Sequence, residues 1–441
     1  MLQTFKNAWK VPELRKKILF TLMILLLYRI GANITVPYVN VAYFDSETSG
    51  LLSSGMFEFM GLLSGSAFTM ATFFALSVSP YITASIVMQL LTIAIPPLER
   101  LSKDENGKKK IAAATRWVTV GLALITSYGY VNMLNMSGML LIDKSINDFF
   151  AWTVMIACFC AGASVIMWLA EKINDHGIGN GISMILFANI LSGGAQAVMD
   201  LINMVKADGE ALQAWGYVLG AGKVLLSLAI ALGAVILVVW FTNSERRIKV
   251  IYAKKVVGRK MFGGQKTNLP LKMNMAGVMP VIFASSIVSI PATIAAFFPA
   301  DNAFRKWVEE WLSQTSPIYI VVFIALIFAF SYFYIAISFN PVEVANNIRS
   351  NGGSIIGIRP QEMAPFIKKI LNRVTLMGAI FLVVIAGTPM IVSAIVKLFD
   401  TSFTSVAFAG TSLLIVVGVA LETVRDLEAQ LAMRNYKGFL D

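Results

Sequence analysis

Residues 59–98 read FMGLLSGSAFTMATFFALSVSPYITASIVMQLLTIAIPPL, and none of these forty side chains is charged. As one helix the stretch would be about 60 Å long, roughly twice the thickness of the hydrocarbon core of a bilayer. It is therefore too long for a single membrane span, and its scattered Gly, Ser, Thr and Pro residues do not suit two ordinary spans. The sequence predicts a membrane segment that is interrupted near its middle.

The rest of the chain has the composition of a polytopic helical membrane protein. Of its 441 residues, 57% are hydrophobic and 14% are charged, whereas soluble domains carry about 25% charged residues. The apolar runs are continuous, which indicates helices and not the alternating strands of a membrane β-barrel. We predict an all-α fold with ten spans, at 18–36, 71–94, 117–136, 151–170, 179–200, 218–242, 274–298, 317–339, 374–396 and 404–423.

Basic residues predict the orientation of these spans. With an even number of spans both termini lie on one side, and the segments on that side hold 29 of the 36 Lys and Arg residues. By the positive-inside rule we place both termini in the cytoplasm. Arg29 lies within the first span, and its role is left open between a partner inside the bundle and a contact with substrate.

Two predicted cytoplasmic loops, 243–273 and 340–373, are long and basic. The first holds nine Lys or Arg residues and one acidic residue, Glu245. Its alternating segment IKVIYA predicts a short β-ribbon, so we expect a folded projection. Surplus positive charge beside a membrane suits anionic lipid, an acidic protein surface or RNA, while orientation and solubility alone are the alternative reading.

Common catalytic and energy-coupling motifs are missing from the sequence. We find no Walker A pattern, no zinc-protease motif and no G-x-S-x-G elbow. A metal or cofactor is not expected, because the chain has one His and its two Cys residues lie in an apolar run. Pro80, Pro280 and Pro291 each predict a helix that lacks one backbone hydrogen bond. Small residues at 284–286 suit either ordinary packing or a seam between helices that opens.

Five stretches together resemble the SecY family, the channel subunits of the bacterial protein-export translocon: PYITASIVMQLL (80–91), EKINDHGIGNGISMILFANI (171–190), LPLKMNMAGVMPVIFASSI (269–287), GIRP (357–360) and GTSLLIVV (410–417). The resemblance extends along essentially the whole chain. It implies two pseudo-symmetric halves of five helices, 1–205 and 206–425, around an hourglass-shaped pore. A cytoplasmic tail, 426–441, follows.

The resemblance also explains the interrupted segment. In the SecY family the stretch before the second spanning helix is a half-helix that plugs the pore, which here maps to about 59–70, with the second span beginning near Ala71. Small residues suit an element that must leave and return. The implied plug residues are Phe59, Met60, Gly61, Leu62, Leu63, Ser64, Gly65, Ser66, Ala67 and Phe68.

An aliphatic ring narrows the pore in this family. Two of its implied pairs have the i, i+4 spacing that places side chains on one helix face. Val78 and Leu186 stand where the family often has Ile, which preserves the chemistry. Read without the family, each position is equally suited to plain core packing. The implied ring residues are Val78, Ile82, Ile182, Leu186, Ile282 and Ile415.

The family further implies a lateral gate between the second and seventh spans and a docking surface on the two basic loops. Gate residues map to Thr83, Ile86, Gln89, Ser285, Ser286 and Ile287. Docking residues for the SecA ATPase or the ribosome map to Arg259, Lys260 and Arg359. The implied partners are SecE and SecG, SecA, the ribosome, polypeptides that carry signal sequences, anionic lipid, SecDF and YidC.

These expectations describe a non-enzymatic, passive protein-conducting channel of the bacterial plasma membrane. Two other classes are weighed against it. An ion-coupled solute permease shares the ten-span plan but needs ion-coordinating groups near the middle of the membrane. A membrane insertase or scaffold without a continuous pore would show no ion current when the plug segment is deleted.

Overall fold

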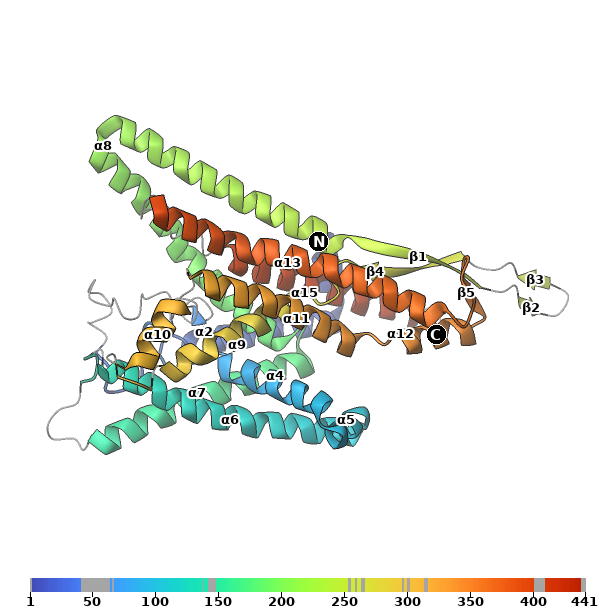
Figure 1. Cartoon of the computed structure of the whole chain (residues 1–441), viewed down its shortest axis with the longest axis horizontal. Coiled ribbons are helices and arrows are strands. Elements are labelled where there is room, and N and C mark those ends of the chain that lie inside the picture. Colours follow the sequence, from blue (N-terminus) through green and yellow to red (C-terminus); the bar gives the residue numbers. More distant parts are fainter. Residues whose placement is uncertain are drawn as a thin grey trace.

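The computed structural model is a helical bundle with small sheets that project from one end (Figure 1). A mostly helical protein was the prediction from sequence, and it is confirmed, with the sheets as an addition. The structure describes residues 2–40, 64–65, 67–136, 138–141, 148–252, 255–257, 260–262, 266–295, 297–299, 302–312, 316–399 and 409–437.

Six helices make up the described N-terminal part. They are α1 (Leu2–Lys10), α2 (Pro12–Gly31), α4 (Ser79–Ala94), α5 (Pro96–Lys103), α6 (Glu105–Met136) and α7 (Asp148–His176). Prolines open α2 and α5, because the fixed φ of proline suits the first helical turn, where its missing N–H would have no partner. α2 ends at Gly31, where a Cβ atom would lie 2.2 Å from the ring of Phe74.

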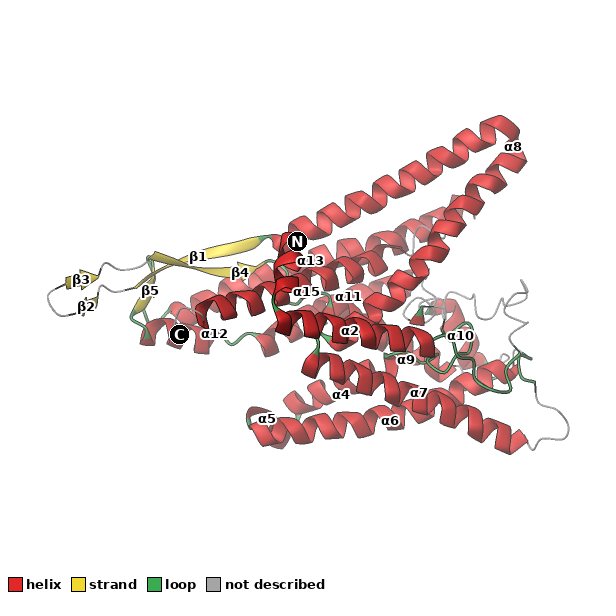
Figure 2. Ribbon diagram, turned by 180° about the vertical axis from the view of Figure 1, so that it is seen from behind, coloured by secondary structure: helices red, strands yellow, loops and turns green. Residues whose placement is uncertain are grey.

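The fifth and sixth predicted spans fall within one helical element, α8 (Gly181–Asn243). Figures 1 and 2 show α8 reversing its direction between its two ends. The two predicted spans, 179–200 and 218–242, therefore correspond to the two arms of α8. The connection between these two predicted spans is also part of α8.

In the described residues, the C-terminal part adds six helices and five strands. The helices are α9 (Met279–Ala295), α10 (Ala303–Trp311), α11 (Pro317–Ser338), α12 (Pro341–Ser350), α13 (Met363–Phe399) and α15 (Ala409–Lys437). The strands are β1 (Glu245–Tyr252), β2 (Lys255–Val257), β3 (Lys260–Phe262), β4 (Lys266–Lys272) and β5 (Gly353–Ile355). Because α15 continues to Lys437, the predicted tail begins inside a helix.

Helix lengths test the span prediction only in part. Among the described residues, four helices are long and apolar enough to cross a membrane, at Asn106–Met136, Asp148–His176, Pro317–Ser350 and Met363–Thr388. A fifth candidate is the pair Ser79–Ala94 and Pro96–Ser102, which is bent by 109°. Gly181–Gly194, Ala231–Asn243 and Met279–Ala295 are shorter apolar helices. The count of ten spans and the orientation of the termini stay predictions.

Two predicted features of the second and seventh spans are wrong. α4 begins at Ser79 and not near Ala71, and residues 67–78 form buried turns, with a bridge at Thr72. Pro80 and Pro280 are each the second residue of a helix, so they begin α4 and α9 and do not interrupt them. The N–H groups of a first turn have no intrahelical partner, which makes proline inexpensive there. Of these three prolines, only Pro291 lies inside its helix.

Both basic loops join in one folded unit. β1 pairs antiparallel with β4, from Glu245 opposite Lys272 to Ile251 opposite Lys266, so the predicted β-ribbon is confirmed. β5, from the second basic loop, adds to the other edge of β1 and gives the order β4-β1-β5. Apolar side chains beneath this sheet form a small core with α12 and α13: Ile248, Val250, Leu271, Ala345, Ile348, Ile355, Met363 and Ile367.

Candidate functional site

The main apolar core of the bundle contains the predicted ring residues. They come from four helices: Val78 and Ile82 at the start of α4, Ile182 and Leu186 in the first turns of α8, Ile282 in α9 and Ile415 in α15. Five of the six are at most 3% exposed, and Ile182 packs against them with partial exposure. These six aliphatic side chains, which we call the aliphatic cluster, come from positions up to 337 residues apart and lie in or against one apolar core.

The GIGNG turn, residues 177–181, positions the α8 members of this cluster. Asn180 caps α8, since its Oδ1 accepts a 3.1 Å hydrogen bond from the N–H of Ile182. Asn174 Oδ1 accepts a second bond, 2.7 Å long, from the N–H of Gly181. Gly179 has a φ of +75°, and a Cβ on Gly181 would lie 2.0 Å from the carbonyl oxygen of Ala170. Glycine is required at both positions, and the start of α8 is fixed by them.

The predicted gate residues lie on two helices that contact each other, α4 and α9. Ile86 is 1% exposed, and Ser285 and Ser286 are also buried. Both serine hydroxyls donate to the carbonyl oxygen of Ile282 at 2.8 Å, within their own helix.

The remaining gate side chains are less buried. Thr83 and Gln89 bond within α4, to Ser79 and Ser85, and Ile287 is half-buried on α9. Among the described residues no hydrogen bond joins α4 to α9 across this seam, so its packing is effectively apolar.

The predicted plug is described only in part. Phe59 to Leu63 and Ser66 lie outside the described residues, whereas Ser64, Gly65, Ala67 and Phe68 are buried. Ser64 Oγ accepts a 3.0 Å bond from the N–H of Phe68, and the hydroxyl of Tyr130 donates to the Phe68 carbonyl.

The buried turns that follow, residues 67–78, satisfy their backbone through other segments. The N–H of Phe73 donates to the carbonyl of Ile34 at 2.7 Å, and the N–H of Val36 donates to the carbonyl of Ala71 at 3.2 Å. Irregular backbone at membrane depth is tolerated when protein supplies its partners in this way.

The structure describes the three predicted docking residues to different extents. Arg359 is exposed, in the turn between β5 and α13. Arg259 lies outside the described residues, and of Lys260 only the backbone is described, at the start of β3. Figure 1 shows both sheets, α5 and α12 at the same end of the bundle.

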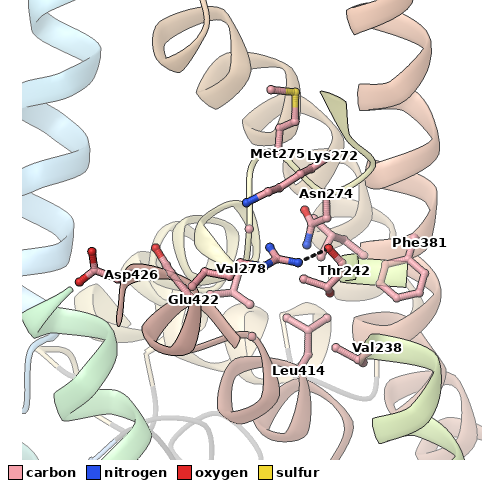
Figure 3. A pocket seen from close by; sticks show the side chains of 14 residues that line it. Val238, Thr242, Lys272, Asn274, Met275, Val278, Phe381, Leu414, Glu422 and Asp426 are labelled. Atoms are coloured by element: carbon pink, nitrogen blue, oxygen red, sulfur yellow. Dashed lines mark hydrogen bonds between the residues drawn. The ribbon is translucent and has the colours of Figure 1, made fainter. Parts of the chain in front are cut away.

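A pocket of about 340 Å³, which sequence analysis missed, lies where α8, β4, α13, α15 and the segment between β4 and α9 meet. Its lining combines the polar side chains of Lys272, Asn274 and Glu422 with the apolar side chains of Val238 and Leu414 (Figure 3). Arg425 Nη2 donates to the carbonyl of Thr242 at 2.7 Å. Burial, and then the nearby Arg425, lower the pKa of the Lys272 ammonium below its ordinary value. No regular spacing in the sequence connects these residues, so no motif signals the pocket.

In the part of the chain that the structure describes, no group of three or more His, Cys, Asp or Glu side chains has metal-binding geometry. Cys158 and Cys160 are free thiols, of which Cys160 is buried and Cys158 is partly buried. The features that stand out are the aliphatic cluster, the apolar seam and the buried turns.

The fold and these features define a polytopic helical membrane protein of the channel type. The chain is similar in fold to a solved structure titled "The structure of a protein conducting channel", with a TM-score of 0.60 and 17% sequence identity over 96% of each chain. It is also similar to Sec61 in the canine ribosome–channel complex, with a TM-score of 0.56 and 16% identity over 96% of each chain.

Sequence comparisons give the family. The family model described as SecY matches residues 72–424. The protein translocase subunit SecY of Streptomyces galbus is 43% identical over 100% of both chains, and that of Bacillus subtilis is 38% identical over 100% of both. This chain therefore belongs to the SecY family, as the five sequence stretches predicted.

Proposed function

We propose that this chain is the pore-forming subunit of the protein-export translocon of a bacterial plasma membrane. In this role it is a passive channel and not an enzyme. Unfolded secretory polypeptides pass through it, and signal sequences and transmembrane segments leave sideways into lipid. The relatives named as translocase subunits and the shared channel fold support the proposal.

One observation carries the proposal: all six ring residues, from distant parts of the chain, lie in or against one buried apolar core. An apolar ring holds water poorly and offers ions no replacement for their hydration shell, so it closes by dewetting. Because aliphatic side chains make no hydrogen bonds, the ring deforms around a moving polypeptide without retaining one particular sequence. A polypeptide channel needs both properties.

Lateral release is assigned to the seam between α4 and α9. A signal sequence carries roughly 10–15 apolar residues, and each CH₂ group that moves from water to lipid contributes about 0.8 kcal/mol. Parting the seam costs little by comparison, because the gate serines and Thr83 keep their hydrogen bonds within their own helices. The seam is therefore suited to open for an apolar client and to close after it.

Energy for transport is proposed to come from partners at the end of the bundle that carries the sheets. That end presents the basic β-ribbon and the exposed Arg359. SecA or a translating ribosome would dock there, with SecE and SecG completing the channel complex and SecDF and YidC assisting. Surplus Lys and Arg residues also suit anionic lipid headgroups. The solved canine relative is a ribosome–channel complex, which favours the ribosome as one partner.

Photo-crosslinking of a stalled secretory chain tests the proposal. A crosslinking amino acid is introduced at Ile82 or at Ile282, which are 2% exposed in the resting structure. Adducts with the stalled chain are expected at both positions. Leu124 on α6, which is 46% exposed, is the matched control and should give lipid adducts only. Absence of polypeptide adducts at Ile82 and Ile282 would overturn the assignment of the ring.

A further inference from the structure

Arg29, whose role the sequence leaves open, has a defined partner in the structure. Its Nη1 donates a 3.0 Å hydrogen bond to Oγ of Ser192 on α8. The Ser192 hydroxyl in turn donates to the carbonyl oxygen of Asn189 at 2.8 Å. Asn189, which is 1% exposed, donates from Nδ2 to Ser77 Oγ at 3.3 Å. A chain of polar contacts thus links α2, α8 and the buried turns within an otherwise apolar interior.

Gly65 rests directly on this polar chain. Its φ is +61°, and a Cβ atom built on it would lie 2.8 Å from both the Asn189 carbonyl oxygen and Ser192 Oγ. Such contacts are too short for any side chain, and one of the two atoms belongs to the α8 backbone. The Ser64–Gly65 turn therefore approaches α8 as closely as a backbone can, and glycine is needed for both conformation and space.

We infer that Arg29, Asn189 and Ser192 form a polar seat that holds the predicted plug segment against α8 in the closed channel. The inference rests on the proposed function, because it assigns positioning residues to the plug. Arg29 acts through Ser192, whose orientation it fixes by a charge-assisted hydrogen bond. The Ser64–Gly65 turn packs its backbone closely on these polar atoms. Such a contact holds the turn in one place without a large apolar surface to separate, which suits an element that must leave and return.

The lack of space at Gly65 provides a direct test. Gly65→Ala places a Cβ atom 2.8 Å from both the Asn189 carbonyl oxygen and Ser192 Oγ, at a φ of +61° that alanine rarely adopts. We expect the turn to leave the seat, which should raise the resting ion current of reconstituted channel complexes about tenfold. Gly193→Ala is the matched control on α8, because a Cβ atom there has no neighbour within 4 Å. A resting current of Gly65→Ala equal to that of the control would overturn the seat. If the current rises as expected but the unmodified complex translocates no preprotein, the seat stands and the proposed function fails.

A second test removes the polar partners themselves. Ser192→Ala removes the hydroxyl that links Arg29 to the Asn189 carbonyl, and Arg29→Gln removes the charge. Both should raise the resting ion current of reconstituted channel complexes by about tenfold, which corresponds to a loss of about 1.4 kcal/mol from the closed state. Ser164→Ala is the matched control, because the Ser164 hydroxyl donates to the carbonyl of Cys160 within its own helix. Resting currents equal to that control would overturn the seat.

Discussion

The backbone N–H of Gly179 donates a 3.1 Å hydrogen bond to Oδ2 of Asp426, 247 residues further along the chain. Beside it, the N–H of Ile178 donates to Thr21 Oγ1 at 3.1 Å. Apolar contacts complete the junction, in a cluster of Ala8, Leu14, Ile178 and Leu427. The first helices, the turn between α7 and α8, and α15 therefore meet at one place. This junction ties the N-terminal part of the bundle to its last helix.

Loss of the Asp426 carboxylate should weaken this junction. Asp426→Ala leaves the Gly179 N–H without its acceptor, which we expect to cost about 1–3 kcal/mol of stability. Thermal unfolding of the purified complex measures the loss as a lower Tm. Glu428→Ala is the control, because Glu428 accepts from Thr4 Oγ1 in an exposed pair and should shift stability by less than about 0.5 kcal/mol. Equal losses for the two variants would contradict a special role for the Gly179–Asp426 bond.

Apolar runs predicted the positions of the helices well and their ends poorly. Each predicted span coincides largely with a helix, because a long uncharged run has few other ways to satisfy its backbone. The start of α4 was misplaced because residues 67–78 are as apolar as a helix. Their turn conformation is fixed by contacts with Ile34, Val36 and Tyr130, which are distant in sequence. No local signal carries such tertiary information.

A polar side chain in the aliphatic cluster should make the channel easier to open. Ile415 is 3% exposed and packs with the other ring residues. Ile415→Asn gives water a partner in the cluster, so we expect the ring to wet more readily. Export of preproteins with defective signal sequences should then improve by about tenfold, equivalent to about 1.4 kcal/mol. Val384→Asn, at a position on α13 that is 52% exposed, is the control and should not improve it.

The family motifs predicted which residues form the candidate site, but not the contacts that hold it. The six ring residues that the resemblance implies all lie in or against the main apolar core, and their role as a pore ring stays a prediction. The pairing of β5 with β1 was missed because three residues, Gly353 to Ile355, are too few to give a strand pattern. The partner of Arg29 was missed because Ser192 lies 163 residues away, with nothing in its surroundings to mark it.

The seam between α4 and α9 should be insensitive to loss of its serine hydroxyls. Ser286 Oγ donates to the Ile282 carbonyl within α9, so Ser286→Ala removes no hydrogen bond across the seam. We expect export within about twofold of the unmodified channel, or about 0.4 kcal/mol. Ile86→Ala, in contrast, removes a buried side chain and should cost about 2–5 kcal/mol of packing. Disulfide trapping across the seam measures how readily the seam opens in each of the two variants. A larger effect of Ser286→Ala than of Ile86→Ala would argue against an apolar seam.

Contact between the two basic loops should depend on Gly353. A Cβ atom at this position would lie 2.8 Å from the ring of Tyr252 and 3.0 Å from the carbonyl oxygen of Ile348. Gly353→Val should therefore separate β5 from β1 and expose residues 340–373 to protease. Ser354→Val is the control, because Ser354 is exposed on the same strand and β-branched residues suit strands. Equal protease resistance of both variants would show that the strand pairing does not depend on this close approach.

Reversing the charge at Arg359 should weaken docking of the partner without affecting assembly of the channel complex. Arg359 is exposed beside the folded unit that both basic loops form, so Arg359→Glu leaves the packing of that unit unchanged. We expect SecA-driven export by reconstituted complexes to fall at least tenfold, while the yield of assembled complex is unaltered. Arg349→Glu reverses an exposed charge on α12 of the same unit and controls for general electrostatic repulsion. Long-range electrostatic repulsion is screened by salt. The loss of export in Arg349→Glu should therefore become smaller between about 0.05 and about 0.3 M salt. The loss of export in Arg359→Glu should persist at both concentrations if Arg359 makes a direct contact. Full export by Arg359→Glu at both salt concentrations would remove Arg359 from the docking surface.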